Sequence, residues 1–111
     1  MTARLPAHLI VNALIRRVNA EGGFATVIAK GEPDAGTLMI VAVDGPYESR
    51  AYERMPQADG TRRWAVSRTQ TIENAQEFSE YLSRRSAQDP DLWIVELDIP
   101  HAERFILYPS D

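Results

Sequence analysis

The stretch that decides the fold is Asp89-Pro90-Asp91-Leu92-Trp93-Ile94-Val95-Glu96-Leu97-Asp98-Ile99. Pro90 restricts the residue before it to extended backbone, so the helical pattern that precedes it has to end there. Every second residue from Trp93 to Ile99 is then apolar, and these residues share one face of a strand. A strand this apolar is typical of the middle of a sheet, and we expect it to be central.

An amphipathic helix precedes this strand. Thr71 can cap its amino terminus, and Arg84 and Arg85 end it, where positive charge is favoured by the helix dipole. Its predicted apolar stripe consists of Ile72, Ala75, Phe78, Tyr81 and Leu82.

A second helix is predicted at the amino terminus. Pro6 suits the first helical position, and apolar residues recur at three- and four-residue spacing from Ile10 to Val18. Gly22-Gly23 interrupts this pattern. We therefore expect a helix over residues 7–21.

Four strands are predicted between the helices. Residues 24–29 and 37–43 are apolar and β-branched, and we expect them to form a hairpin around the loop Lys30–Gly36. Residues 47–55 alternate in polarity and predict a strand with one wet face, and Asp59-Gly60 predicts a hairpin turn into a strand over residues 62–68. The simplest arrangement is an antiparallel meander.

These elements predict one α+β domain over residues 1–111, a length that suits a single core. The order is α-β-β-β-β-α-β, followed by a short apolar C-terminal segment. We expect a mainly antiparallel sheet of about five strands with both helices on one face, because each helix has an apolar stripe to bury.

Composition excludes several classes of protein. The chain has no cysteine, which rules out disulfides and thiolate nucleophiles. Its net charge of −4 argues against a nucleic-acid partner. The apolar stretch over residues 9–15 is interrupted by Asn12 and is shorter than the about 20 residues of a membrane span. We expect a cytoplasmic protein that does not contact a membrane.

No motif for catalysis or for a cofactor is present. The two histidines, His8 and His101, lack the spacing of a metal site, and no serine lies in a nucleophile elbow. Pro33-Asp34 is also found in metal-dependent nucleases, but the Asp/Glu-x-Lys pair that such enzymes require is missing. We therefore expect no catalytic residue, no metal and no cofactor, in a protein that is not an enzyme.

Polar residues in three places suit contacts with another molecule. The loop after the first predicted strand is chemically distinctive, both helices end in arginine doublets, and the third predicted strand mixes charge with an aromatic ring. The predicted interaction surface consists of Lys30, Glu32 and Asp34 in the loop, Arg16, Arg17, Arg84 and Arg85 at the helix ends, and Arg50, Tyr52 and Arg54 on the strand.

Segments along nearly the whole chain resemble one family. They are Arg4–Leu9, Ala13–Arg17, Gly22–Ala25, Lys30–Gly36, Tyr81–Arg85 and Asp89–Trp93. On these segments the chain resembles DUF1491, a family of short, mainly alphaproteobacterial proteins of unknown function. The resemblance implies a bacterial cytoplasmic single domain and provides no activity, cofactor or catalytic residue to carry over.

Two functions from different classes remain. The first is a non-enzymatic protein-interaction module with an unknown protein partner. The alternative is a small-molecule, nucleotide or anion-binding domain in which the arginines converge as a clamp. We also expect a homodimer, because the strand-like segment Phe105–Tyr108 needs a cover and a second copy can supply one.

Overall fold

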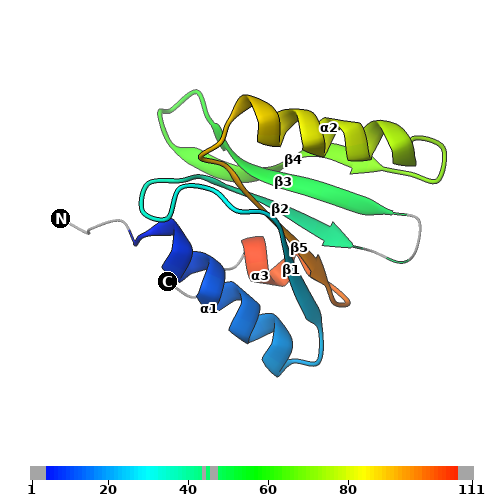
Figure 1. Cartoon of the computed structure of the whole chain (residues 1–111), viewed down its shortest axis with the longest axis horizontal. Helices are drawn as coiled ribbons and strands as arrows, with labels where there is room; N and C mark the ends of the chain where they lie inside the picture. The colour runs from blue at the N-terminus through cyan, green and yellow to red at the C-terminus, as the bar shows by residue number, and fades with distance from the viewer. Residues whose placement is uncertain (1–4, 44, 46–47, 108–111) are drawn as a thin grey trace.

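The computed structural model describes residues 5–43, 45 and 48–107. Its elements, in chain order, are α1 (Ala7–Ala20), β1 (Phe24–Ala29), β2 (Leu38–Val43), β3 (Ser49–Pro56), β4 (Arg62–Gln70), α2 (Ala75–Gln88), β5 (Trp93–Asp98) and α3 (Arg104–Leu107) (Figure 1). The predicted α+β class with a five-stranded, mainly antiparallel sheet is confirmed.

The strand order in the sheet is β1-β5-β2-β3-β4. β5 therefore occupies the interior position that its apolar sequence predicts. It pairs antiparallel with β1 and parallel with β2. The predicted hairpin of β1 with β2, and with it the four-stranded meander, is wrong because β5 lies between these two strands. An uninterrupted apolar strand gains most when neighbours cover both of its edges and both of its faces.

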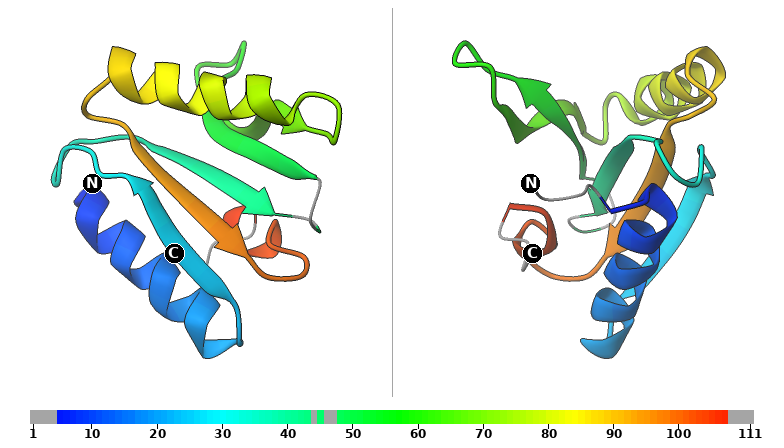
Figure 2. Two further views of the ribbon diagram at one scale, coloured as in Figure 1. Left: turned by 45° about the vertical axis from the view of Figure 1, so that its right-hand side comes forward. Right: turned by 90° about the vertical axis from the view of Figure 1, so that its left-hand side faces the viewer.

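The helices lie on opposite faces of the sheet, so the prediction that both cover one face is wrong (Figure 2). α1 and α3 pack on Trp93, Val95 and Leu97 of β5. α2 packs on the other face, against Met39, Val41 and Ile94. The reason is that β2 and β5 are apolar at successive positions and expose apolar side chains on both faces.

The hairpin of β3 and β4 forms as predicted from Asp59-Gly60. Gly60 adopts a φ of 88°, and the Asp59 carboxylate accepts hydrogen bonds from the Thr61 amide and hydroxyl at 3.0 and 2.6 Å. The last pair between β2 and β3 is Met39–Glu53, so residues 54–56 pair with β4 alone among the described strands. The hairpin thus leaves the sheet as a projecting arm (Figure 2).

The C-terminal segment is helical where we expected a strand. After β5, hydrogen bonds from the Arg104 and Phe105 amides to the carbonyls of His101 and Ala102 start α3. Phe105 and Ile106 are buried in the same cluster as α1. The chain covers these apolar residues itself, which removes the reason given for a dimer through the tail. Tyr108, like Tyr47 at the start of the third predicted strand, lies outside the described residues.

Both long helices are found where the sequence predicts them, with one difference in bounds. α1 spans Ala7–Ala20, close to the expected 7–21. α2 begins at Ala75, and Thr71 is not its cap. The Asn74 side chain accepts a hydrogen bond from the Thr71 amide at 2.6 Å and holds the preceding residues in a turn. Ile72 consequently lies outside the helix and is 67% exposed.

Candidate functional site

The loop Lys30–Gly36 has a structural role that the sequence did not reveal. The Ala7 and His8 amides at the start of α1 donate to the carbonyls of Asp34 and Pro33 at 3.1 and 2.8 Å. The first amides of a helix lack partners within it, and α1 has no side-chain cap, so the loop carbonyls supply the missing acceptors.

Two further contacts anchor this loop. The indole nitrogen of Trp93 donates to the Glu32 carbonyl at 2.8 Å, and the Glu32 carboxylate accepts hydrogen bonds from the Asp34 and Ala35 amides. A Cβ at Gly31 would lie 2.2 Å from the Asp91 carbonyl oxygen, so only glycine allows the approach of the two loops. Of the predicted contact residues here, Lys30 and Asp34 remain exposed, while the Glu32 carboxylate serves the loop itself.

The arginine doublets at the ends of the two helices do not converge. Arg16 and Arg17 belong to α1, whereas Arg84 and Arg85 belong to α2 on the opposite face of the sheet. The Arg17 guanidinium lies 5.1 Å from the centre of the Phe105 ring. These two doublets therefore do not form an anion clamp with each other.

Arg85 is committed to an ion pair inside the protein. Its two terminal nitrogens donate to the two carboxylate oxygens of Glu53 at 2.8 and 2.7 Å, and the Tyr81 hydroxyl joins this network. The hydrogen bond from Arg85 lowers the pKa of Glu53, and the carboxylate in turn raises the pKa of Arg85. Both groups stay charged and offset each other. Arg84, one position earlier, is exposed.

Tyr52 is not a surface residue, which corrects the predicted contact strand. It is 5% exposed and belongs to the cluster under α1 and α3. We expected this face of β3 to be exposed to solvent. The expectation is wrong, because α1 and α3 pack on this face. Arg50 on the same strand lies 3.5 Å from the Glu103 carboxylate, and Arg54, at the start of the arm, is exposed.

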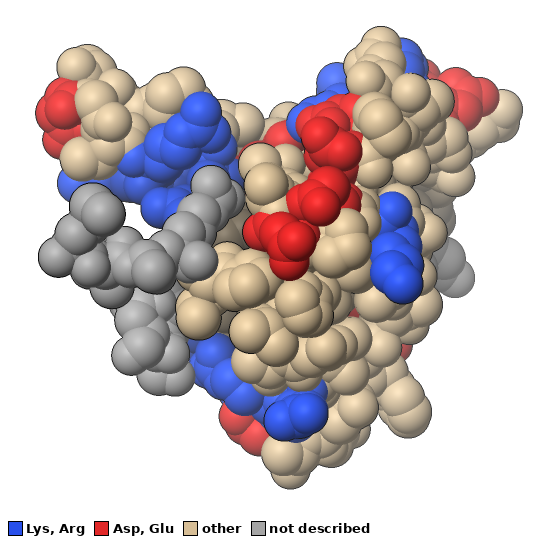
Figure 3. Space-filling view, turned by 60° about the vertical axis from the view of Figure 1, so that its left-hand side comes forward, with Lys and Arg blue, Asp and Glu red and all other residues tan. Residues whose placement is uncertain are grey.

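A cleft of about 670 Å³ opens where the arm leaves β2. We call it the arginine cleft. Arginine side chains gather over the arm, on one side of this region (Figure 3). The residues that line the cleft are Ile10, Thr37, Leu38, Glu53, Arg54, Arg62, Trp64 and Arg85.

Neither Arg54 nor Arg62 makes an ion pair within residues 5–43, 45 and 48–107. The list of predicted contact residues contained Arg54 but missed Arg62 and Trp64. The predicted hairpin turn could have identified Arg62 and Trp64. It pairs Arg54 with Trp64 across the strands, and Arg62, two residues before Trp64 on β4, faces the same side of the sheet.

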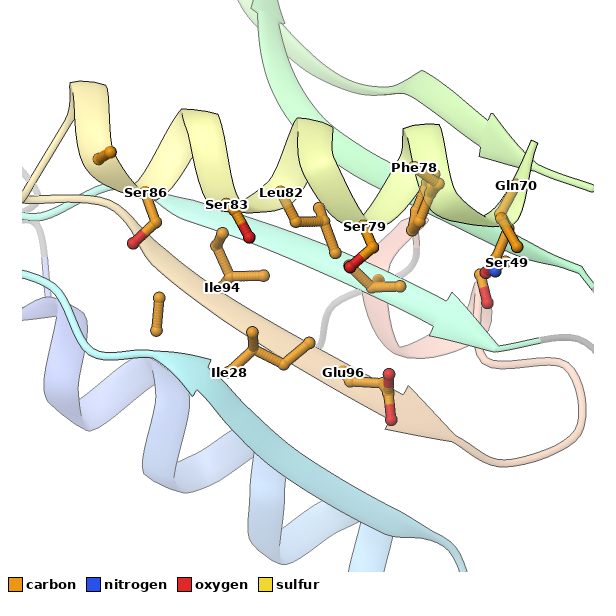
Figure 4. A pocket seen from close by; sticks show the side chains of 14 residues that line it. Ile28, Ser49, Gln70, Phe78, Ser79, Leu82, Ser83, Ser86, Ile94 and Glu96 are labelled. Carbon is orange, nitrogen blue, oxygen red and sulfur yellow. The ribbon is translucent and has the colours of Figure 1, made fainter.

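The second cavity is a groove of about 560 Å³ between α2 and the β1 side of the sheet. We call it the α2 groove. Ser79, Ser83 and Ser86 of α2 line one wall, and Ile28, Ile94 and Glu96 line the other (Figure 4). Phe78 and Leu82 also contribute, so the groove combines apolar side chains with a polar rim of similar extent.

The described part of the chain lacks two further features. No group of three or more histidine, aspartate or glutamate side chains that could hold a metal ion was found there. None of its helices combines the length and apolar character that crossing a membrane requires.

Comparisons with known proteins place this geometry in a family. A family model described as "Protein of unknown function (DUF1491)" matches residues 5–107. No curated protein matches the chain.

Three solved structures are similar to this chain. The crystal structure of a DUF1491 family protein from Caulobacter crescentus CB15 is 34% identical, with a TM-score of 0.78, over 93% of this chain and 95% of that one. An NMR structure of a DUF1491 family protein from the same organism is 33% identical, with a TM-score of 0.76, over 95% and 94%. The solution structure of protein Atu0922 from A. tumefaciens is 29% identical, with a TM-score of 0.74, over 95% and 94%. The chain therefore belongs to the DUF1491 family.

Proposed function

We propose that the protein is a non-enzymatic interaction module that binds an extended apolar segment of a partner protein along the free edge of β1. One observation carries this proposal: the two edges of the sheet differ in charge. β4, at one edge, has three arginines in its sequence RRWAVSRTQ. β1, at the other, has the sequence FATVIA and no charged residue.

The difference matters because an edge strand has unpaired backbone groups that attract other strands. Proteins protect such edges with charged side chains, which are costly to cover. β4 has this protection and β1 lacks it. Phe24, Val27 and Ile28 of β1 are 71%, 38% and 45% exposed. An apolar, β-branched and uncharged edge is suited to accept one more strand.

The α2 groove supports the same mode of binding. Ile28 and Ala29 of β1 line it, so it opens beside the edge that a partner strand would join. Side chains of an added strand alternate between the two faces of the sheet. Those on the α2 side extend over the groove, where its apolar floor and serine rim offer both burial and hydrogen bonds.

A matched pair of variants tests the proposal. Ile28→Lys charges the β1 edge, and Val66→Lys charges the β4 edge at a position of equal exposure, 44% against 45%. The tagged wild-type protein and both variants are used to capture a partner from cytoplasmic extract, the compartment expected from the sequence. Amide hydrogen exchange of the purified complex then locates the contact.

We expect Ile28→Lys to abolish capture, Val66→Lys to retain it, and the outward-facing amides of β1 to exchange more slowly in the complex. A partner that binds Ile28→Lys as tightly as wild type contradicts the proposal. So does protection outside β1 and the groove. A homodimer, detected by sedimentation equilibrium and lost in Ile28→Lys, means that a second copy occupies the edge and that the separate partner is wrong.

A second candidate function is the binding of a small anion. It is favoured by the arginine cleft, where Arg54 and Arg62 make no ion pair within the described residues and Glu53 is already neutralised by Arg85. Titration with inorganic phosphate tests it. Amide shifts in the cleft that disappear in Arg54→Gln support anion binding, and no shift at millimolar phosphate contradicts it.

A further inference from the structure

The arginine cleft contains more than positive charge. Ile10 of α1 and Leu38 of β2 contribute apolar surface, and the half-buried Trp64 contributes an indole ring. Its volume of about 670 Å³ falls within the roughly 300–1,000 Å³ of small-molecule sites. Such sites combine an apolar wall with a few placed polar groups, which is the composition found here.

The charge of the lining favours a ligand with about two negative charges. The cleft is lined by three arginines and one glutamate. Glu53 and Arg85 form a two-pronged ion pair and cancel. Arg54 and Arg62 remain, and a guanidinium group matches the oxygens of a phosphate by two parallel hydrogen bonds.

The strand register of the arm places the Trp64 ring beside Arg54 and Arg62. Arg54 is the cross-strand partner of Trp64, and Arg62 lies two residues before Trp64 on the same strand. Side chains in these relations share one face, about 5 Å apart across the strands and about 7 Å apart along one strand. A ligand that joins a planar ring to a phosphate through a short linker spans this arrangement.

We infer that the arginine cleft binds a mononucleotide-type small molecule, with its ring against Trp64 and its phosphate between Arg54 and Arg62. This assignment rests on the second candidate function, anion binding at the same cleft. A long nucleic acid is disfavoured because the chain has a net charge of −4. Stacking on tryptophan tolerates any planar base, so the geometry specifies the class of ligand and leaves the base open.

The test uses five probes on the full chain: AMP, UMP, adenosine, inorganic phosphate and pyrophosphate. Amide chemical shifts and tryptophan fluorescence report binding at low salt, where phosphate contacts are strongest. We expect AMP or UMP to bind at least about tenfold more tightly than phosphate or adenosine, because ring and phosphate contacts add in one ligand. The shifts should map to the cleft.

Four variants locate the contacts. Arg54→Gln and Arg62→Gln should each weaken nucleotide binding about tenfold or more, since each removes a charge-assisted hydrogen bond. Trp64→Leu should weaken nucleotide binding and leave pyrophosphate binding unchanged. Arg63→Gln is the matched control, because Arg63 lies between the two key residues of β4 and does not line the cleft. It loses the same charge and should bind like wild type.

The possible outcomes distinguish nucleotide binding from the binding of a simple anion. Phosphate or pyrophosphate binding at the cleft without a gain from the ring overturns the nucleotide assignment and leaves anion binding standing. No binding of any anionic probe at millimolar concentration overturns both. An equal loss in Arg63→Gln and Arg62→Gln reveals general attraction to the arm and also overturns the assignment. Urea unfolding of each variant confirms that the loss is not a loss of fold.

Discussion

The two faces of the sheet differ in how completely helices cover them. On one face α1 and α3 enclose a large cluster that includes Trp93, Val95 and Leu97. On the other face α2 covers a smaller cluster around Met39 and Ile94, and the α2 groove remains open beside β1. The closed face contains 14 buried core residues against 7 on the α2 face, and burial of apolar area is the main source of stability.

The residues that stabilise the fold and those proposed to bind a partner lie in different parts of the molecule. The α2 face has an open groove and a free, uncharged edge strand next to it. Both proposed sites lie at the borders of the covered regions. We therefore expect substitutions on the closed face to lower stability more than those around the groove.

The largest effect is expected for Trp93→Ala on the closed face. Trp93 is 4% exposed, and its indole nitrogen donates to the Glu32 carbonyl. Its removal leaves a cavity and takes one of two hydrogen-bond donors from the Glu32 carbonyl, which keeps the Gly36 amide. It should lower the free energy of unfolding by about 3–5 kcal/mol. Urea unfolding measures this. Ile72→Ala, at a residue 67% exposed, is the control and should change it by less than about 0.5 kcal/mol.

A smaller effect is expected for Phe78→Ala on the α2 face. Phe78 is also 4% exposed, but it lines the groove, so water can enter the space that its ring vacates. The cost should be the transfer free energy of the ring without a closed cavity, about 2–3 kcal/mol. The same urea experiment decides it. A loss equal to that of Trp93→Ala would mean that the two faces contribute alike.

The ion pair beneath α2 should make stability depend on pH. Because the pKa of Glu53 is lowered in the folded protein, its contribution is complete above the ordinary glutamate pKa and is lost as pH falls through the lowered value. At pH 7, Glu53→Gln should cost about 1–2 kcal/mol, since the pair is only partly buried.

Urea unfolding of both proteins at several pH values checks this. The gap between wild type and Glu53→Gln should close as pH falls below about 4, where carboxylates become protonated. A gap that stays constant down to pH 2 would contradict the role of the charged carboxylate. Glu77→Gln, at an exposed residue of α2, is the control.

The smallest effect, with the opposite sign, is expected for Ser83→Ala in the wall of the α2 groove. Ser83 is exposed on a helix, where alanine is favoured over serine by about 0.5 kcal/mol. The variant should therefore be slightly more stable, which a rise in Tm detects. A fall in Tm would show that the serine rim supports the fold.

Local signals in the sequence predicted several elements correctly. The spacing of apolar residues located α1 and the body of α2, and Pro90 with the alternation after it located β5. Asp59-Gly60 located the hairpin of β3 and β4. Each of these signals depends on residues within a few positions of one another, so it can be interpreted without knowing the rest of the fold.

The candidate site was predicted less well. The predicted contact residues included Arg54, which lines the arginine cleft. They also included Tyr52, which is buried, and Glu32 and Arg85, whose charged groups make contacts inside the protein. A polar residue in a loop or at a helix end looks the same in sequence whether it meets solvent or its own chain. Its partner here lies as far as 32 residues away, as for Arg85 and Glu53.

Local sequence signals were sufficient for most helices and strands, because backbone preference and the period of apolar residues act locally. The C-terminal segment, helical where we expected a strand, is an exception. Tertiary structure alone decided that β5 separates β1 from β2, that α2 lies opposite α1, and that β1 is left as an uncharged edge. These outcomes depend on pairing between distant segments and on covering both faces of β2 and β5 at once. Such pairing lowers the free energy only when the whole core is assembled.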